Sequence, residues 1–170
     1  MISSFHCESP VQQPETAFFL GAVKHEKAET SDPETPTIEI EHQVMFFDTD
    51  CAAVVHNLAY LRIIETARTL LAEQLGLAMA EMAGRGVYPV LLRTEVDYRR
   101  PAKLGDRLIV RGRLDRLERV RFWCEFEIIR PVDELLLVTC RQSLALIELP
   151  EAKPLRLPGE WTARYAHLRG

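Results

Sequence analysis

The sequence predicts an α+β domain in which one antiparallel sheet wraps around one long helix. Residues 57–75 place apolar side chains at three- and four-residue steps, which is helical spacing. Several later segments alternate apolar and polar residues instead, and strict alternation is typical of antiparallel strands with one covered face. A sheet that curls around the apolar helix is the simplest packing that buries it.

The length of 170 residues corresponds to one domain, and 47% hydrophobic residues suffice for a core without disulfides or a structural metal. Residues 1–36 contain four prolines and an acidic stretch, so we expect an N-terminal extension that is flexible. Residues 37–150 form the folded domain. Residues 151–170 contain further prolines and form a C-terminal tail.

The spacing of apolar residues changes from extended to helical between residues 47 and 57, and this change separates the first two elements. A strand is expected over residues 37–47, where apolar residues punctuate an extended segment. The long helix follows over residues 57–75, with Asn57 as the expected N-cap and Gly76 as the expected C′ residue.

Four more strands complete the expected sheet. They cover residues 89–100, 107–117, 119–130 and 135–149, and the connections between them are short. Gly105-Asp106 supplies the turn chemistry between the first two of these strands.

Charge and hydropathy exclude several classes of protein. With 21 Lys+Arg against 25 Asp+Glu, the net charge of −4 argues against a nucleic-acid binder. Residues 93–121 hold ten basic and five acidic residues, which suits a small anionic ligand or a solvated strand face. No apolar run approaches the ~20 residues of a membrane span. The first twelve residues lack the features of a signal peptide, so a cytoplasmic location is expected.

The four cysteines do not form a metal-binding or disulfide pattern. Cys7, Cys51, Cys124 and Cys140 show no C-x-x-C spacing, and no pair of histidines lies nearby. We therefore expect no metal and reduced thiols, with Cys124 and Cys140 buried as small hydrophobic residues.

The densest polar cluster lies in residues 47–57, between the first strand and the helix. A helix N-terminus has unpaired N–H groups and a positive dipole end, so it can polarise a carbonyl and hold an oxyanion. A carboxylate facing it can attack that carbonyl or deprotonate a water. Asp and Asn before a helix are also ordinary turn and cap residues, so spacing alone leaves both interpretations open. A Cys51–His56 thiol nucleophile lacks a third group to orient it.

Three motifs resemble those of the hotdog-fold acyl-CoA thioesterases, in particular the 4-hydroxybenzoyl-CoA thioesterase family with its tol-pal-associated members. The motifs are Asp48-Thr49-Asp50 with Val54-Val55-His56-Asn57-x-x-Tyr60, then Glu65-x-Ala67-Arg68, and Val96-Asp97-Tyr98-Arg99-Arg100-Pro101-Ala102-x-x-Gly105-Asp106. The resemblance covers roughly residues 38–149. It implies a five-stranded antiparallel sheet around one long helix. It also implies a homo-oligomer, a dimer or tetramer, with active sites at the dimer interface.

The resemblance also implies roles for three loop residues. Asp50, the second acid of the D-x-D motif, matches the catalytic carboxylate. Asn57 matches the residue whose backbone N–H polarises the thioester carbonyl. His56 lies where several relatives have an aromatic residue, and it could orient water, assist the leaving thiolate or cap the loop.

Two departures and two further residues bear on this assignment. Relatives usually have glycine before the two branched loop residues, whereas this chain has Ala53, which resists a positive φ, so a slightly different loop path is expected. Some relatives carry histidine at the position of Asn57. Glu65 is expected to form an ion pair with Arg68 rather than act as a base. Tyr60 lies on the apolar stripe and is expected in the core.

The phosphates of coenzyme A need cations, and the resemblance places Arg119 and Arg121 at that subsite, although solvated turn arginines are an equal alternative. No cofactor is expected beyond the CoA of the substrate. The implied function is hydrolysis of an acyl- or aroyl-CoA thioester to the free acid and CoA. Two alternatives stay open: a hotdog enoyl-CoA hydratase, whose D-x-N-P-x-H pattern is missing here, and a non-catalytic acyl-CoA-binding module.

Overall fold

The computed structural model describes residues 35–170. The expected flexible extension, residues 1–36, therefore lies outside the described residues except for its last two. Five long strands form one antiparallel sheet in the order β1-β3-β4-β5-β2, and a two-residue strand, β6, pairs with β5. The strands are β1 (Thr37–Gln43), β2 (Val87–Tyr98), β3 (Arg107–Leu117), β4 (Arg121–Arg130), β5 (Leu135–Glu148) and β6 (Lys153–Pro154).

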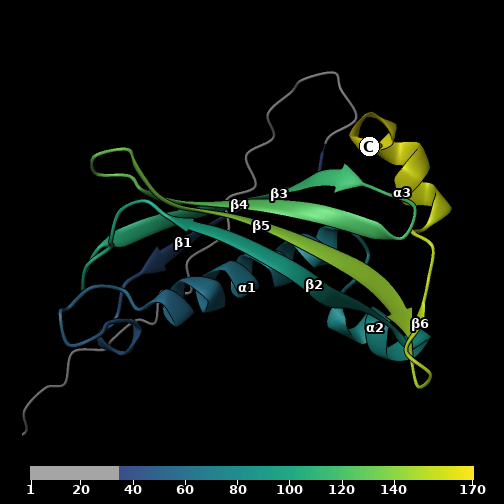
Figure 1. Cartoon of the computed structure of the whole chain (residues 1–170), viewed down its shortest axis with the longest axis horizontal. Coiled ribbons are helices and arrows are strands. Elements are labelled where there is room, and N and C mark those ends of the chain that lie inside the picture. The colour runs from purple at the N-terminus through teal and green to yellow at the C-terminus, as the bar shows by residue number, and fades with distance from the viewer. Residues whose placement is uncertain (1–34) are drawn as a thin grey trace, which may run out of the picture.

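The sheet curls around α1, as Figure 1 shows, and this confirms the predicted α+β architecture. The helices are α1 (Asn57–Gln74), α2 (Met79–Arg85) and α3 (Gly159–Arg164), with short 3₁₀ turns at Phe46–Asp48 and Ala166–Leu168. One face of α1 packs against the inner face of the sheet. The core side chains of α1 are Ala59, Tyr60, Ile63, Ile64, Ala67 and Leu71.

Two local features explain how the sheet closes on the helix. Gly112 lies in the middle of β3, where a Cβ would come within 2.7 Å of the ring of Phe126. Only glycine fits there without a shift. At the end of α1, Gly76 has φ +73°, and the N–H of Leu77 donates to the carbonyl of Ala72. This is a Schellman turn, and it confirms the predicted C′ glycine.

The C-terminal residues close the far end of the core. Trp161 of α3 is buried and packs edge-on against Phe122, with ring centroids 5.4 Å apart. Its indole N–H donates to the carbonyl of Leu75 over 3.1 Å. These contacts dock the segment that follows β6 onto the C-terminal end of α1.

Some element boundaries differ from the prediction. The first strand ends at Gln43 instead of residue 47, because the chain turns through Phe46–Asp48 before the loop. Helix α2 was not predicted. It has seven residues and none is buried, so it is too short and too exposed to show a clear apolar period.

The predicted burial of Cys124 and Cys140 is confirmed. Cys124 and Cys140 are buried and Cys51 is exposed, whereas Cys7 lies outside the described residues. Burial raises the pKa of both buried thiols to about 12. They are therefore protonated and unreactive near neutral pH. Separately, no helix within residues 35–170 is both long and apolar enough to cross a membrane.

Candidate active site

The loop before α1 is a tight hairpin that returns the chain to the helix start. Thr49 and Val55 form an isolated antiparallel bridge. The N–H of Asp50 donates to the carbonyl of Val54 over 2.9 Å, and the N–H of His56 donates to the carbonyl of Asp48 over 2.9 Å. This pairing fixes the polar cluster identified in the sequence as one structural unit at the N-terminal end of α1.

Asp48 is the buried anchor of this loop. Its side chain has no exposed surface and lies next to three donors. The N–H of Met45 donates over 2.9 Å, His42 Nε2 lies at 3.2 Å, and the guanidinium of Arg62 forms an ion pair with it. These donors come from the loop, β1 and α1, so one carboxylate ties three elements together. Sequence reasoning assigned Asp48 no role, because aspartate is rarely fully buried and no pattern signals it.

A second segment holds the loop from the other side. The N–H of Val55 donates to the carbonyl of Ala102, and the N–H of Ala102 donates to the hydroxyl of Tyr60 over 2.7 Å. Tyr60 is buried as predicted, and burial raises the pKa of its hydroxyl. The N–H of Leu104 donates to the carbonyl of Ala53. The motif around Ala102 therefore supports the loop of residues 48–56, which we call the aspartate loop, through hydrogen bonds. This contact accounts for the occurrence of both motifs in one chain.

Asp50 differs from Asp48 in being exposed. Its Oδ1 accepts the N–H of Ala52 over 2.8 Å, which fixes the side chain in an Asx turn. No described residue donates a hydrogen bond to the other carboxylate oxygen. The loop thus presents one restrained carboxylate with an oxygen available for chemistry.

The start of α1 differs from the prediction at one residue. His56, not Asn57, is the N-cap: its Nδ1 accepts the N–H of Leu58 over 3.2 Å, and Asn57 is the first helical residue. Among the described residues the N–H of Asn57 has no acceptor. It points out of the positive end of the helix dipole, the arrangement that stabilises a developing oxyanion. The hydroxyl of Tyr98 on β2 lies 3.5 Å from the carbonyl oxygen of Asn57, a neighbour that sequence reasoning missed.

The loop contains a strained residue. Ala53 has φ +57°, so alanine adopts here the left-handed conformation that glycine adopts more easily. The cost is about 1–2 kcal/mol. The hydrogen bonds of the hairpin and of Leu104 over-determine this conformation, and they position Asp50 despite the strain.

Two other candidate groups, the thiol of Cys51 and the carboxylate of Glu65, do not join the site. The exposed thiol of Cys51 makes no hydrogen bond to His56, whose Nδ1 is already used by the helix cap. Glu65 accepts from Arg68 over 3.0 Å, which confirms the predicted ion pair on the surface of α1. Asp50 is therefore the carboxylate that the geometry favours.

Arg119 and Arg121 lie at the opposite end of the sheet. They flank the turn after β3, whereas the aspartate loop is hydrogen-bonded to the segment before β3. Ten residue steps along β3 span ~33 Å. Within one chain the structure therefore groups Asp50, His56 and Asn57 and separates both arginines from them.

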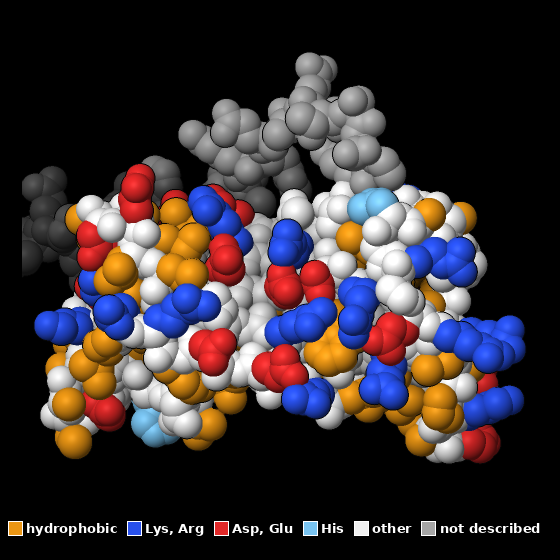
Figure 2. All heavy atoms as spheres, turned by 45° about the horizontal axis from the view of Figure 1, so that its top comes forward, with side chains coloured by type: hydrophobic (Ala, Val, Ile, Leu, Met, Phe, Trp, Pro, Cys, Tyr) orange, Lys and Arg blue, Asp and Glu red, His pale blue; other side chains and the backbone are white. Residues whose placement is uncertain are grey.

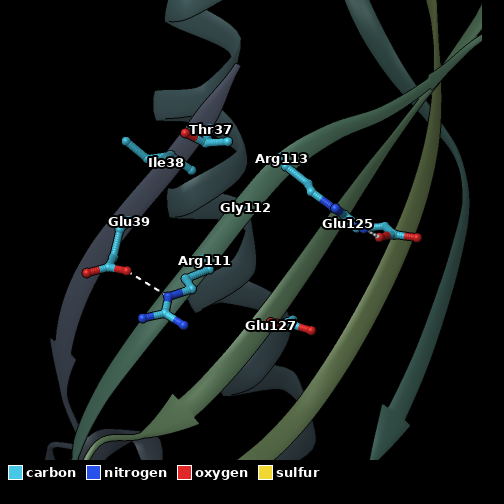
Figure 3. Close-up of a pocket in the computed structure, with 8 residues that line it drawn as sticks. All are labelled: Thr37, Ile38, Glu39, Arg111, Gly112, Arg113, Glu125 and Glu127. Carbon is cyan, nitrogen blue, oxygen red and sulfur yellow. Dashed lines mark hydrogen bonds and ion pairs between the residues drawn. The ribbon is translucent and has the colours of Figure 1, made fainter. Parts of the chain in front are cut away.

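Two of the hollows in the described part of the chain are compared with the predicted site. A groove of about 420 Å³ lies over β1, β3 and β4, and Figure 3 shows its charged lining, with Glu39 paired to Arg111 and Glu125 paired to Arg113. It contains none of the predicted site residues. An apolar hollow of about 140 Å³ lies between α1, α2 and the sheet, with Leu91 of β2 at its lining. Among residues 35–170, no group of three His, Cys, Asp or Glu side chains could hold a metal ion.

The curled sheet, its central helix and the aspartate loop at the helix start define a hotdog-fold protein of the thioesterase type. Residues 44–165 match the Thioesterase-like superfamily, and the chain belongs to that superfamily.

Individual relatives agree with this assignment. A 1,4-dihydroxy-2-naphthoyl-CoA hydrolase of Synechocystis sp. is 33% identical over 127 residues, covering 74% of this chain and 91% of that protein. The acyl-CoA thioesterase YbgC of Haemophilus influenzae is 27% identical over 128 residues, covering 75% and 93%. The crystal structure of a 1,4-dihydroxy-2-naphthoyl-CoA thioesterase from Synechocystis superposes with a TM-score of 0.68 at 29% identity, covering 78% of this chain and 97% of that one.

The capping role of His56 predicts a simple pair of variants. His56→Ala should lower the free energy of unfolding by about 1 kcal/mol, because the N–H of Leu58 loses its acceptor. His56→Asn should lose much less, since asparagine is a good N-cap. Urea unfolding of both variants measures the difference. Equal losses in the two variants would show that the ring stabilises the loop by something other than the cap.

Proposed function

We propose that this protein is an acyl-CoA thioesterase that hydrolyses an acyl- or aroyl-CoA thioester to the free acid and CoA. One observation carries the proposal: the same hairpin presents the restrained carboxylate of Asp50 and leads directly into the N–H of Asn57, which has no acceptor among the described residues. Membership of the thioesterase-like superfamily makes the chain a thioester hydrolase, and the two relatives named above are named for CoA thioesters.

The chemistry assigns one task to each group. The N–H of Asn57 donates to the thioester oxygen and stabilises the negative charge that develops there. The Asp50 carboxylate either attacks the carbonyl carbon, giving an anhydride that water then hydrolyses, or removes a proton from the water that attacks. In both routes the C–S bond breaks, water supplies the new oxygen, and CoA leaves as the thiol. His56 is a positioning residue that fixes the first turn of α1.

A second copy of the chain fits the free edge of β2. Within the described residues β2 pairs only with β5, so its other edge is open over a strand of twelve residues. Leu91 and Leu92 on this strand are 45% and 52% exposed. Long apolar edges of this kind are seldom left uncovered. We therefore propose a homodimer in which the two β2 strands pair.

The same edge suggests where the acyl group and the CoA phosphates bind. The apolar hollow lies beside β2 and next to the proposed interface, but it is lined by the C-terminal half of α1, about 16 Å or more from Asn57 along the helix. We therefore propose that it takes the acyl group of a substrate held at the partner's site. The exposed Arg119 and Arg121 lie too far from Asp50 of their own chain to serve it, so we propose that they bind the phosphates of a CoA held at the partner's site.

The role of Asp50 is tested by Asp50→Asn. This variant keeps an oxygen to accept the N–H of Ala52 but loses the base, so kcat/KM should fall about 10²–10⁴-fold with the unfolding midpoint unchanged. Release of CoA thiol measures it, with 1,4-dihydroxy-2-naphthoyl-CoA, benzoyl-CoA and medium-chain acyl-CoAs as substrates. Glu65→Gln, which changes an exposed acid on α1, is the matched control and should retain activity. If Asp50→Asn kept most of its turnover, the proposal would fail.

The interface is tested by Leu92→Glu. A charge on this edge strand should oppose pairing of two β2 strands, so the wild type should sediment as a dimer or tetramer and the variant as a monomer. Thiol release should fall together with assembly. Val132→Glu changes a residue that is 86% exposed on the turn after β4, and it should alter neither property. A fully active wild-type monomer would contradict the proposed dimer.

A further inference from the structure

Arginine side chains gather at the end of the sheet that is opposite the aspartate loop. The C-terminal residues fold back onto the turn after β3: the N–H of Leu157 donates to the carbonyl of Arg119, and Arg169 forms a bridge with Leu117. Figure 2 shows blue Lys and Arg side chains at the right, the end at which α3 lies in Figure 1, as well as over the rest of this face. We call this group the arginine patch; it consists of Arg119, Arg121, Arg156, Arg164 and Arg169.

The arginine patch lacks acidic partners in the described chain. All five side chains are exposed, and none forms an ion pair with a residue in 35–170. Several arginines in the middle of the sheet are paired: Arg113 pairs with Glu125 and Arg141 pairs with Asp115. Arg107, at the other end of β3, is unpaired within the described residues, as the patch is. Glu118, which precedes Arg119 in the chain, already pairs with Arg116 over 2.8 Å. Glu160 of α3 leaves the patch with a net positive charge.

The chain enters the described structure beside this patch. Thr35 Oγ1 lies 2.8 Å from Nε2 of His167, in the 3₁₀ turn that precedes Arg169. Immediately before Thr35, residues 26–34 contain four acids and one lysine. Nine residues span at most ~30 Å, so the link to Thr35 puts all four acids within reach of the patch.

We propose that the acidic segment of residues 26–34 docks on the arginine patch of its own chain. The covalent link supplies an effective concentration in the millimolar range, so ion pairs that are individually weak suffice for substantial occupancy. The contact is electrostatic and depends on salt, because charges more than ~8 Å apart are screened at physiological ionic strength. An anion that binds Arg119 or Arg121, such as the CoA phosphates proposed above, has to displace the segment from these two side chains. This inference does not depend on the proposed enzymatic activity.

The test uses the full-length chain and the reactivity of individual arginines. Phenylglyoxal modifies exposed guanidinium groups, and peptide mapping by mass spectrometry gives a rate for each. The variant Glu26→Gln, Glu29→Gln, Asp32→Asn and Glu34→Gln removes the negative charge without changing the chain length. Its rates at Arg119, Arg156 and Arg169 should rise at least about threefold over the wild type in low salt. In 0.5 M salt the two proteins should converge.

Three controls make the result specific. Arg99 and Arg107, at the other end of the sheet, should react equally in both proteins. A variant that neutralises Glu41, Glu81, Glu127 and Glu134 makes the same change in net charge elsewhere and should leave the patch protected. Protection should be independent of protein concentration. Equal rates in wild type and acid-neutralised variant, the same gain in the control variant, or protection that disappears on dilution would each overturn the proposal.

Discussion

The buried carboxylate of Asp48 is the interaction on which the candidate site depends. It has no contact with solvent, and donors from β1, the loop and α1 surround it. Only the carboxylate is buried, since Arg62 is 56% exposed, and removing one of its donors leaves a buried acceptor unsatisfied at a cost of about 1–3 kcal/mol. This single group therefore fixes both the entry of the chain into the loop and the position of the helix that follows.

The different roles of Asp48 and Asp50 follow from the burial of Asp48. The Asp48 carboxylate is buried and bound by the donors that hold the loop. Asp50, two residues further on, is exposed, and one of its oxygens has no donor from the described residues. The loop can carry the strain at Ala53 because Asp48 and the segment around Ala102 hold it from two sides. The arrangement brings a carboxylate to a helix N-terminus without relying on the flexibility of a long loop.

Much of the fold could be predicted from periodicity, since α1 and the long strands bury one regular face each. The sequence could not reveal α2, which buries no residue, nor the docking of Trp161 on Phe122, which depends on a contact between distant segments. The motifs pointed to Asp50 and to the N–H of Asn57, whereas the helical period and residue type placed the cap at Asn57. Residue type favours asparagine over histidine as a cap, and only the backbone geometry shows that His56 takes this position.

The most direct test of this account compares Asp48→Asn with Asp50→Asn in one experiment that records thermal unfolding and release of CoA thiol. The account predicts that Asp48→Asn loses both stability and turnover, although its side chain cannot reach a substrate, because the loop is no longer anchored to Arg62 and His42. Asp50→Asn should lose turnover alone. An Asp48→Asn protein with the stability and turnover of the wild type would contradict the central claim.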